Sequence, residues 1–159
     1  MRSSISIHVD AAPRRVFDLA RDVTRWPELL PHYRRVTVHG AIDARTTAQM
    51  VAVRPIGRSD RRGIPVTWRA ETWSDASDAA DLQLRFRHIR GVTRGMEVTW
   101  HIRARADGAH SHVTIEHDFR RRLPLVGDRL LPWLVDRFFT RPIAGRTLRR
   151  FKALAEASR

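Results

Sequence analysis

The segment from Met96 to Phe119 alternates apolar and polar residues on both sides of an Asp107-Gly108 pair. Two alternating runs joined by Asp-Gly are typical of an antiparallel hairpin with a two-residue turn, which here places Ala106 opposite Ala109. A shift of one residue would move the apolar set to the solvent face, so the pairing is strongly specified. The predicted inner pairs are Ile102 with Val113, Trp100 with Ile115, Val98 with His117 and Met96 with Phe119, and the outer pairs are Arg103 with His112, His101 with Thr114, Thr99 with Glu116 and Glu97 with Asp118.

Prolines and hydrophobic periodicity divide the rest of the chain. Residues 3–9 alternate as a half-buried strand, and a helix begins with Pro13 in its first turn. Pro27 and Pro31 restrict the next segment to a short helix or turn. Six further strands are predicted over residues 33–41, 46–54, 64–74, 81–90, 95–105 and 111–121. A helical period runs from Val126 to Ala157, in which Pro142 introduces a kink or a break.

This order of elements predicts a single α+β domain over residues 1–159. Its core is a curved, seven-stranded antiparallel sheet with a long C-terminal helix against one face. Two short helices follow the first strand. No linker or internal repeat interrupts the pattern.

The net charge of +13 could indicate a nucleic-acid-binding protein. However, Lys152 is the only lysine among 30 basic residues, and the arginines are scattered without interleaved exposed aromatic residues. We therefore interpret them as a solvated surface and expect no nucleic-acid partner. The chain has no cysteine, and no apolar run has the length of a membrane span or the form of a signal peptide, so a cytoplasmic protein is expected.

Several motifs occur in a specific order along the chain. Ala12-Pro13, Val16-Phe17 and Asp22 precede the run from Trp26 to Leu29, which Tyr33 follows; Gly95 precedes a strand with Trp100, and the last helix ends in "LRRFKALAE". With these features nearly the whole chain resembles the START-like, or SRPBCC, superfamily, and within it the polyketide cyclase/dehydrase and coenzyme-Q-binding-protein-like branch. The resemblance implies a helix-grip fold, in which the sheet wraps around the C-terminal helix and leaves a cavity for a lipid, quinone or aromatic polyketide.

The resemblance also implies that the segment between the two prolines closes one end of this cavity, with Trp26, Leu30 and Tyr33 as inner wall. The alternative is that Trp26 and Leu30 are ordinary core residues. It stays open because large apolar residues usually belong to the core. Strand parity and helical period supply the other candidates. The predicted ligand-binding residues are Trp26, Leu30, Tyr33, Trp68, Thr72, Phe86, His88, Trp100, His117, Leu130, Leu134 and Phe138.

Tyr33, His88 and His117 are the candidate catalytic residues. A histidine can act as general acid or base near neutral pH, and a phenol can polarise a carbonyl group. The alternative for each histidine is a buried neutral ring that bonds to a backbone carbonyl or to water. For either histidine alone the sequence favours that alternative, because it places no partner beside the ring.

The resemblance to enzymes of this branch implies an arginine that projects into the cavity. It would lie on the strand that here runs from Val66 to Trp73. Thr72 occupies the corresponding place, and the parity of Arg69 directs its side chain to solvent. Arg90 has inward parity at the end of the next strand and is the candidate substitute. The departure at Thr72 weakens the prediction of cyclase activity.

Eight histidines raise the question of a metal site. His110 and His112 share a strand face near His101, but Arg103 opposite His112 disfavours a cation. Glycine-rich phosphate loops and catalytic triads are not visible in the sequence either. We therefore expect no metal and no cofactor.

Two segments could bring the protein into transient contact with an anionic membrane surface. The loop from Arg54 to Pro65 is basic, and the segment from Arg120 to Phe139 mixes arginine with leucine, tryptophan and phenylalanine, as interfacial helices do. The alternatives are a solvated loop and a helix face that belongs to the core. Exposed edge strands allow either a monomer or a homodimer.

Three functions remain after these observations. The first is a carrier or binding protein for a hydrophobic small molecule, which we expect. The second is a polyketide aromatase/cyclase (dehydratase) that uses polar residues of the cavity. The third is an interaction module without a functional cavity.

Overall fold

The computed structural model describes residues 2–56, 62–91, 93–119 and 136–157. These residues form one seven-stranded antiparallel sheet in the order β1-β7-β6-β5-β4-β3-β2. The strands are β1 (Arg2–Val9), β2 (Tyr33–Ile42), β3 (Arg45–Pro55), β4 (Gly63–Asp75), β5 (Asp81–Gly91), β6 (Met96–Ala104) and β7 (Ser111–Phe119). The helices are α1 (Pro13–Ala20), the 3-10 turn η1 (Val23–Arg25), α2 (Trp26–Leu29), the π-helical turn η2 (Asp136–Thr140) and α4 (Arg141–Glu156).

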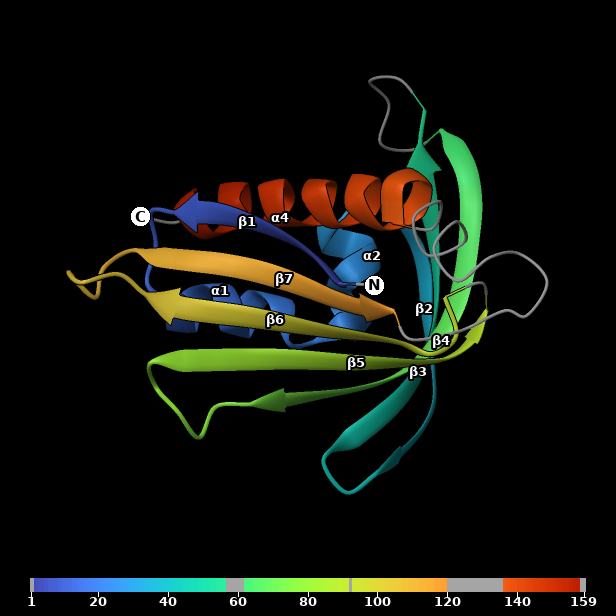
Figure 1. Ribbon diagram of the computed structural model, residues 1–159, viewed down its shortest axis with the longest axis horizontal. Coiled ribbons are helices and arrows are strands. Elements are labelled where there is room, and N and C mark those ends of the chain that lie inside the picture. Colours follow the sequence, from blue (N-terminus) through green and yellow to red (C-terminus); the bar gives the residue numbers. More distant parts are fainter. Residues whose placement is uncertain (1, 57–61, 92, 120–135, 158–159) are drawn as a thin grey trace.

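The sheet curves strongly around the helices. In Figure 1, β1, β7, β6 and β5 run along α4, whereas β2, β3 and β4 turn upward and stand across its amino-terminal end. Helices α1 and α2 lie on the same concave side as α4. This is the helix-grip arrangement that the sequence predicts, with two short helices after the first strand.

The register between β6 and β7 is the predicted one at all eight pairs, from Met96 with Phe119 to Arg103 with His112. The unfavourable Glu97–Asp118 pair is relieved by arginine on each side. The guanidinium of Arg87 lies 3.5 Å from the Glu97 carboxylate, and that of Arg2 lies 3.6 Å from Asp118.

The turn between these strands is wider than the predicted two-residue turn. The backbone N–H of Arg105 donates to the carbonyl oxygen of His110 across 2.9 Å, and that of Gly108 donates to Arg105 across 2.8 Å. The Asp107 carboxylate accepts the N–H of His110 at 3.1 Å, which stabilises the open loop. The register is unchanged because Arg105 and His110 extend the same ladder.

Prolines delimit the helices as the sequence indicates. Pro13 lies in the first turn of α1, and α2 has only four residues before Pro31. Pro142 lies in the first turn of α4, which continues directly from the π-helical turn η2 because Thr140 keeps helical backbone angles, so the helix changes its type just before the proline without a break. The predicted start of this last helix at Val126 lies outside the described residues.

Helix α4 packs against β1, and together they form part of the hydrophobic core. Its buried side includes Leu148 and Phe151. Gly145 permits a close approach to β1, because a Cβ at this position would meet Ile5 Cδ1 at 3.3 Å. Within the described parts of the chain, no helix has the length and apolarity needed to cross a membrane.

Candidate ligand-binding cavity

A cavity of about 80 Å³ lies between the concave face of the sheet and the amino-terminal part of α4. Every described element from α2 to α4 contributes to its wall. The lining residues are Trp26, Tyr33, Met50, Val66, Trp68, Phe86, His88, Thr93, Met96, Val98, Trp100, Ile115, His117, Thr140, Ile143, Ala144 and Thr147. No charged side chain of the described residues is among them.

The structure brings together most of the residues that the sequence singles out. Seven of the predicted ligand-binding residues line the cavity, namely Trp26, Tyr33, Trp68, Phe86, His88, Trp100 and His117. Leu30 is fully buried in the core and Thr72 is buried, but neither is among the lining residues. Leu130, Leu134 and the side chain of Phe138 lie outside the described residues. The role of the seven in binding stays a prediction.

Several lining residues were not among the predicted candidates. Val98 and Ile115 follow from strand parity alone, and Met50 follows from its pairing with Trp68 in the neighbouring strand. Thr147 lies one helical turn before Phe151, so helical period could have identified it. Thr93 carries no signal in the sequence, because it lies in the β5–β6 loop.

Trp26 belongs to both the core and the cavity wall. Its indole Nε1 donates to the carbonyl oxygen of Ala20 across 2.9 Å, so this polar atom is satisfied within the protein. Its ring contacts Tyr33 edge-on at a centroid distance of 5.0 Å and lies 5.9 Å from Trp100. Trp26 is therefore both a core residue and part of the cavity wall, so the two alternatives for it do not exclude each other.

Tyr33 lies beside a buried polar group on α4. Burial raises the pKa of its phenol, and the neighbouring Thr147 hydroxyl opposes this change. Thr147 donates to the carbonyl oxygen of Ile143 at 3.0 Å and lies 2.9 Å from Nε2 of His32. Burial, with smaller contributions from Arg146 and Arg149, lowers the pKa of His32 to about 4. Both the phenol and the imidazole are therefore uncharged at neutral pH.

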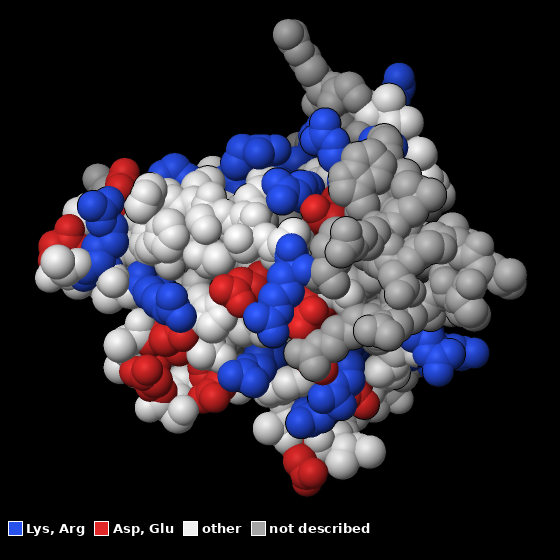
Figure 2. Space-filling model, viewed as in Figure 1, with Lys and Arg blue, Asp and Glu red and all other residues white. Residues whose placement is uncertain are grey.

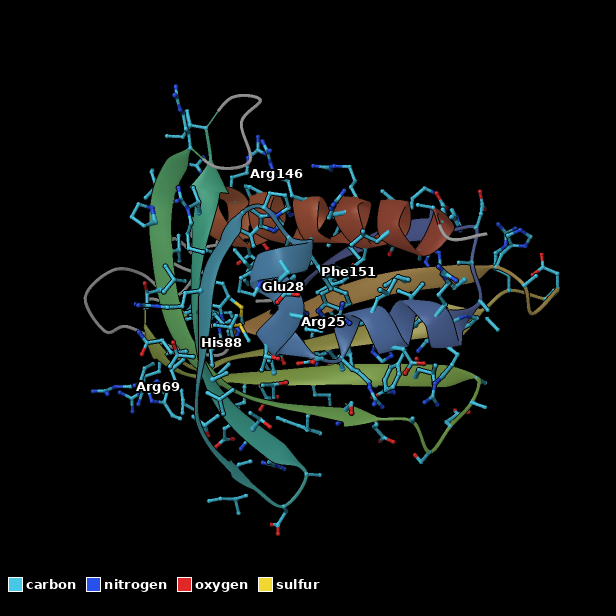
Figure 3. All side chains as sticks on the ribbon, turned by 180° about the vertical axis from the view of Figure 1, so that it is seen from behind. Arg25, Glu28, Arg69, His88, Arg146 and Phe151 are labelled. Carbon is cyan, nitrogen blue, oxygen red and sulfur yellow. The ribbon has the colours of Figure 1, made fainter. Side chains whose placement is uncertain are left out.

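His88 extends from β5 into the interior (Figure 3). Its Nδ1 forms a hydrogen bond of 2.7 Å with the Thr93 hydroxyl, and its ring stacks on Trp68 with a centroid distance of 5.8 Å. Burial lowers the pKa of His88 to about 3, and the neighbouring His117 adds a smaller contribution in the same direction. The ring is therefore neutral and held in one orientation.

His117 projects from β7 near the ion pair of the buried Asp136 with the exposed Arg141. Burial lowers its pKa to about 4, Asp136 opposes this shift, and Arg141 adds to it. The Asp136 carboxylate accepts from Arg141 Nε at 2.8 Å and from the Ser3 hydroxyl at 2.5 Å. The charges of Asp136 and Arg141 thus compensate each other, and His117 is neutral above about pH 5.

Neither Arg69 nor Arg90 is among the residues that line the cavity. Arg69 lies on the outer side of the sheet, as its parity predicts, and donates to Gln49 Oε1 at 3.2 Å (Figure 3). The prediction that Arg90 points inward is wrong, because its side chain is exposed. A bulge at Ile89 places Arg90 opposite Arg69, while His88 pairs with Ala70. One extra residue in a strand reverses the parity of everything beyond it.

The arrangement suits binding better than acid–base chemistry. A base with a pKa of about 3 or 4 is weak at pH 7, since efficient general bases have a pKa near the working pH. The described residues include no group of three or more His, Asp or Glu side chains that could hold a metal ion. What remains is an aromatic cavity with a few neutral polar groups, which is the usual composition of small-molecule sites.

Comparison with known proteins places the chain in a family. A family model described as polyketide cyclase / dehydrase and lipid transport matches residues 1–156. A sequence search of curated proteins finds no match.

Solved structures show the same fold at low sequence identity. A protein from Thermus thermophilus is 22% identical, with a TM-score of 0.73 over 99% of both chains. The Zhui aromatase/cyclase from a Streptomyces species is 14% identical, with a TM-score of 0.73 over 98% of this chain and 93% of that one. A START superfamily protein from Mycobacterium smegmatis is 10% identical, with a TM-score of 0.64 over 98% of this chain and 97% of that one. The chain belongs to the polyketide cyclase/dehydrase and lipid transport family and has its START-like helix-grip fold.

Proposed function

We propose that the protein binds a hydrophobic small molecule, such as a lipid, a quinone or an aromatic polyketide, and acts as a carrier or binding protein. The observation that carries this proposal is a cavity walled by Trp26, Trp68 and Trp100 and free of charged side chains among the described residues. Burial of apolar surface drives such binding at roughly 25 cal/mol per Å². The family description, which includes lipid transport, supports the same class of ligand.

The volume of the cavity sets a condition on this function. Small-molecule sites usually measure about 300–1,000 Å³, whereas this cavity measures about 80 Å³. A ligand of lipid or polyketide size must therefore displace side chains of the wall. We expect the cavity to widen when such a ligand binds.

An aromatase/cyclase is the competing function, because the Zhui aromatase/cyclase shares the fold. Such a reaction needs a proton acceptor and a group that stabilises developing negative charge. Here the two histidines have pKa values of about 3 and 4, and Arg69 and Arg90 lie outside the cavity. The geometry therefore favours binding without chemistry.

Native mass spectrometry of the purified protein, followed by denaturing extraction, tests the proposal. A co-purifying hydrophobic mass that disappears on denaturation would support it and would identify the ligand. If none co-purifies, titration with hydrophobic probes such as 2-naphthol or decylubiquinone, followed by tryptophan fluorescence, provides a second test. The proposal is wrong if no such probe changes the emission of the cavity tryptophans.

We also propose that the β3–β4 hairpin contacts an anionic membrane surface, from which the protein collects or delivers its ligand. Ile56 and Ile64 near the hairpin end are 60% and 42% exposed. Ile64 lies on the same face of β4 as the cavity residue Val66, because alternate residues share a face. The N–H of Ile56 donates to the carbonyl oxygen of Arg62, whose side chain is exposed.

The distribution of charged side chains supports contact between this hairpin and an anionic membrane. Figure 2 shows basic side chains along the upper edge, beside α4 and the β3–β4 end, whereas basic and acidic side chains are mixed lower on this face. Exposed apolar side chains flanked by cations favour an anionic bilayer surface.

Sedimentation with phosphatidylglycerol vesicles tests the membrane contact. Replacing both Ile56 and Ile64 by serine should lower the bound fraction several-fold, whereas Ile42→Ser is the matched control, since Ile42 is 79% exposed on β2. Equal loss in all variants, or no loss in any, would refute the assignment to the hairpin. Binding of 2-naphthol in solution should be unchanged in the double variant, which separates this proposal from that of ligand binding.

A further inference from the structure

Two buried histidines line the cavity, and the described residues pair only part of their hydrogen-bonding capacity. His88 and His117 are each only 9% exposed. Within the described part of the chain, the ring of His88 bonds only to Thr93, through Nδ1, and the ring of His117 has no hydrogen-bond partner. Buried polar groups are nearly always paired. These ring nitrogens therefore mark the place where a polar group of the ligand, or water in its absence, completes the pairing.

The surroundings of these histidines favour an uncharged partner. No cation of the described residues lines the cavity, and Arg141, the cation that acts on His117, is already paired with Asp136 at 2.8 Å. Both imidazoles are neutral at pH 7 because burial disfavours their protonated form. An anion placed here would lose its hydration without gaining a counter-charge, which is costly in a protein interior.

The shape of the wall favours a flat ring. Trp68 and His88 stack with planes 16° from parallel, and Trp26, Phe86 and Trp100 form the adjoining aromatic surface. Aromatic side chains prefer offset-stacked or edge-on contacts with other rings. A cavity of about 150 Å³ holds benzene, so this cavity of about 80 Å³ has to widen even for a single ring.

We infer that the cavity selects uncharged hydroxylated aromatic compounds, with the ring against the tryptophans and the hydroxyl group at His88 and His117, and discriminates against carboxylates of the same size. This inference rests on the proposed binding function and specifies its ligand class. A neutral imidazole nitrogen can accept the hydroxyl proton, and an imidazole N–H can donate to the hydroxyl oxygen, so a hydroxyl can pair with either ring. A carboxylate can only accept, and it brings an uncompensated charge.

Isothermal titration calorimetry with two series of matched probes tests the inference at pH 7.5. The first series is p-cresol, p-xylene and benzoate, and the second is 2-naphthol, 2-methylnaphthalene and 2-naphthoate. In whichever series binds, the hydroxyl compound should bind at least tenfold more tightly than the carboxylate and about threefold to tenfold more tightly than the methyl compound. Equal binding of hydroxyl compound and carboxylate would overturn the inference and leave the binding function intact. No binding of any probe would contradict the binding function itself.

Variants of His88 and His117 test whether these two rings cause the preference for hydroxyl compounds. His117→Phe and His88→Phe keep an aromatic side chain but remove its hydrogen-bonding atoms, so both should reduce the preference for the hydroxyl over the methyl compound. His39→Gln, an exposed histidine on β2, is the control that should retain it. Circular dichroism confirms that each variant is folded, and either phenylalanine variant alone suffices for the test. Wild-type selectivity in a folded His117→Phe or His88→Phe variant would show that the polar group of the ligand does not reside at that ring.

Discussion

The indole Nε1 of Trp26 donates a hydrogen bond to the carbonyl oxygen of Ala20 across 2.9 Å and so ties the start of α2 to the end of α1. This bond, together with the contacts of the indole to the core, predicts a large structural cost of substitution. Trp26→Ala should lower the free energy of unfolding by about 3–5 kcal/mol, and Trp26→Phe by about 1–3 kcal/mol. Urea denaturation measures both.

Trp73 is the matched control for that prediction. It is half-buried on β4, and its ring interacts with the Arg45 guanidinium at 4.5 Å. An exposed cation–π contact is worth about 0.5–1 kcal/mol, so Trp73→Phe should cost less than Trp26→Phe. A larger loss of stability for Trp73→Phe than for Trp26→Phe would mean that Trp26 does not anchor α2 in the fold.

The buried histidines predict a loss of stability in mild acid. Burial lowers the pKa of His32 and His117 from 6.5 to about 4 and that of His88 to about 3. The unfolded chain takes up protons near pH 6.5 while the folded protein does not, so stability is complete above that pH and is lost as the pH falls towards 4. A shift of one pKa unit corresponds to about 1.4 kcal/mol, so each histidine contributes on the order of 3 kcal/mol over this window.

Urea denaturation at intervals between pH 7.5 and pH 4 measures this loss. His88→Phe should flatten the dependence because it removes one titrating ring, whereas the exposed His39→Gln should not. A free energy of unfolding that stays constant down to pH 4 would show that these rings are not buried as described.

Thr93 and Thr72 form a matched pair of buried threonines with different partners. Thr93 bonds to Nδ1 of His88 at 2.7 Å, whereas no side-chain hydrogen bond of Thr72 occurs among the described residues. Thr93→Val leaves a buried imidazole nitrogen unpaired and should cost about 1–3 kcal/mol. Thr72→Val should be neutral or slightly stabilising, because it removes a hydroxyl without a partner. Equal effects in thermal denaturation would contradict the assigned bond.

Gly91 and Gly108 test the close approach of β4 and the β5–β6 loop. Both have positive φ, at 96° and 68°, but only at Gly91 would a Cβ collide, with the carbonyl oxygen of Thr67 at 2.6 Å. Gly108→Ala carries the conformational cost alone, about 1–2 kcal/mol. Gly91→Ala should cost clearly more in chemical denaturation, because the backbone of β4 must also shift. Similar costs would show that β4 has room to move here.

Local sequence predicts most of the architecture because its signals are short-range. Alternation on both sides of the Asp107-Gly108 pair predicts the β6–β7 register, since a shift of one residue would move the apolar set to the solvent face. The same parity rule identifies five of the predicted cavity residues, and the family resemblance implied the other two, Trp26 and Tyr33. The wider turn at Asp107 escaped prediction because side-chain capping of backbone N–H groups competes with the two-residue turn.

Within the candidate site, tertiary structure decides what strand parity cannot. A bulge at Ile89 turns Arg90 outward, and a bulge arises from the fit between two strands, not from the residue types of one.

The sequence by itself determined the alternating strands, the proline-delimited helices and the aromatic inner face, because each depends on the spacing of neighbouring residues. Only the tertiary structure decided that Leu30 packs into the core, that Thr93 reaches the wall of the cavity, and that the cavity measures about 80 Å³. These depend on how the curved sheet and α4 approach each other, and the close approach of Gly145 to Ile5 on β1 joins segments far apart in the chain.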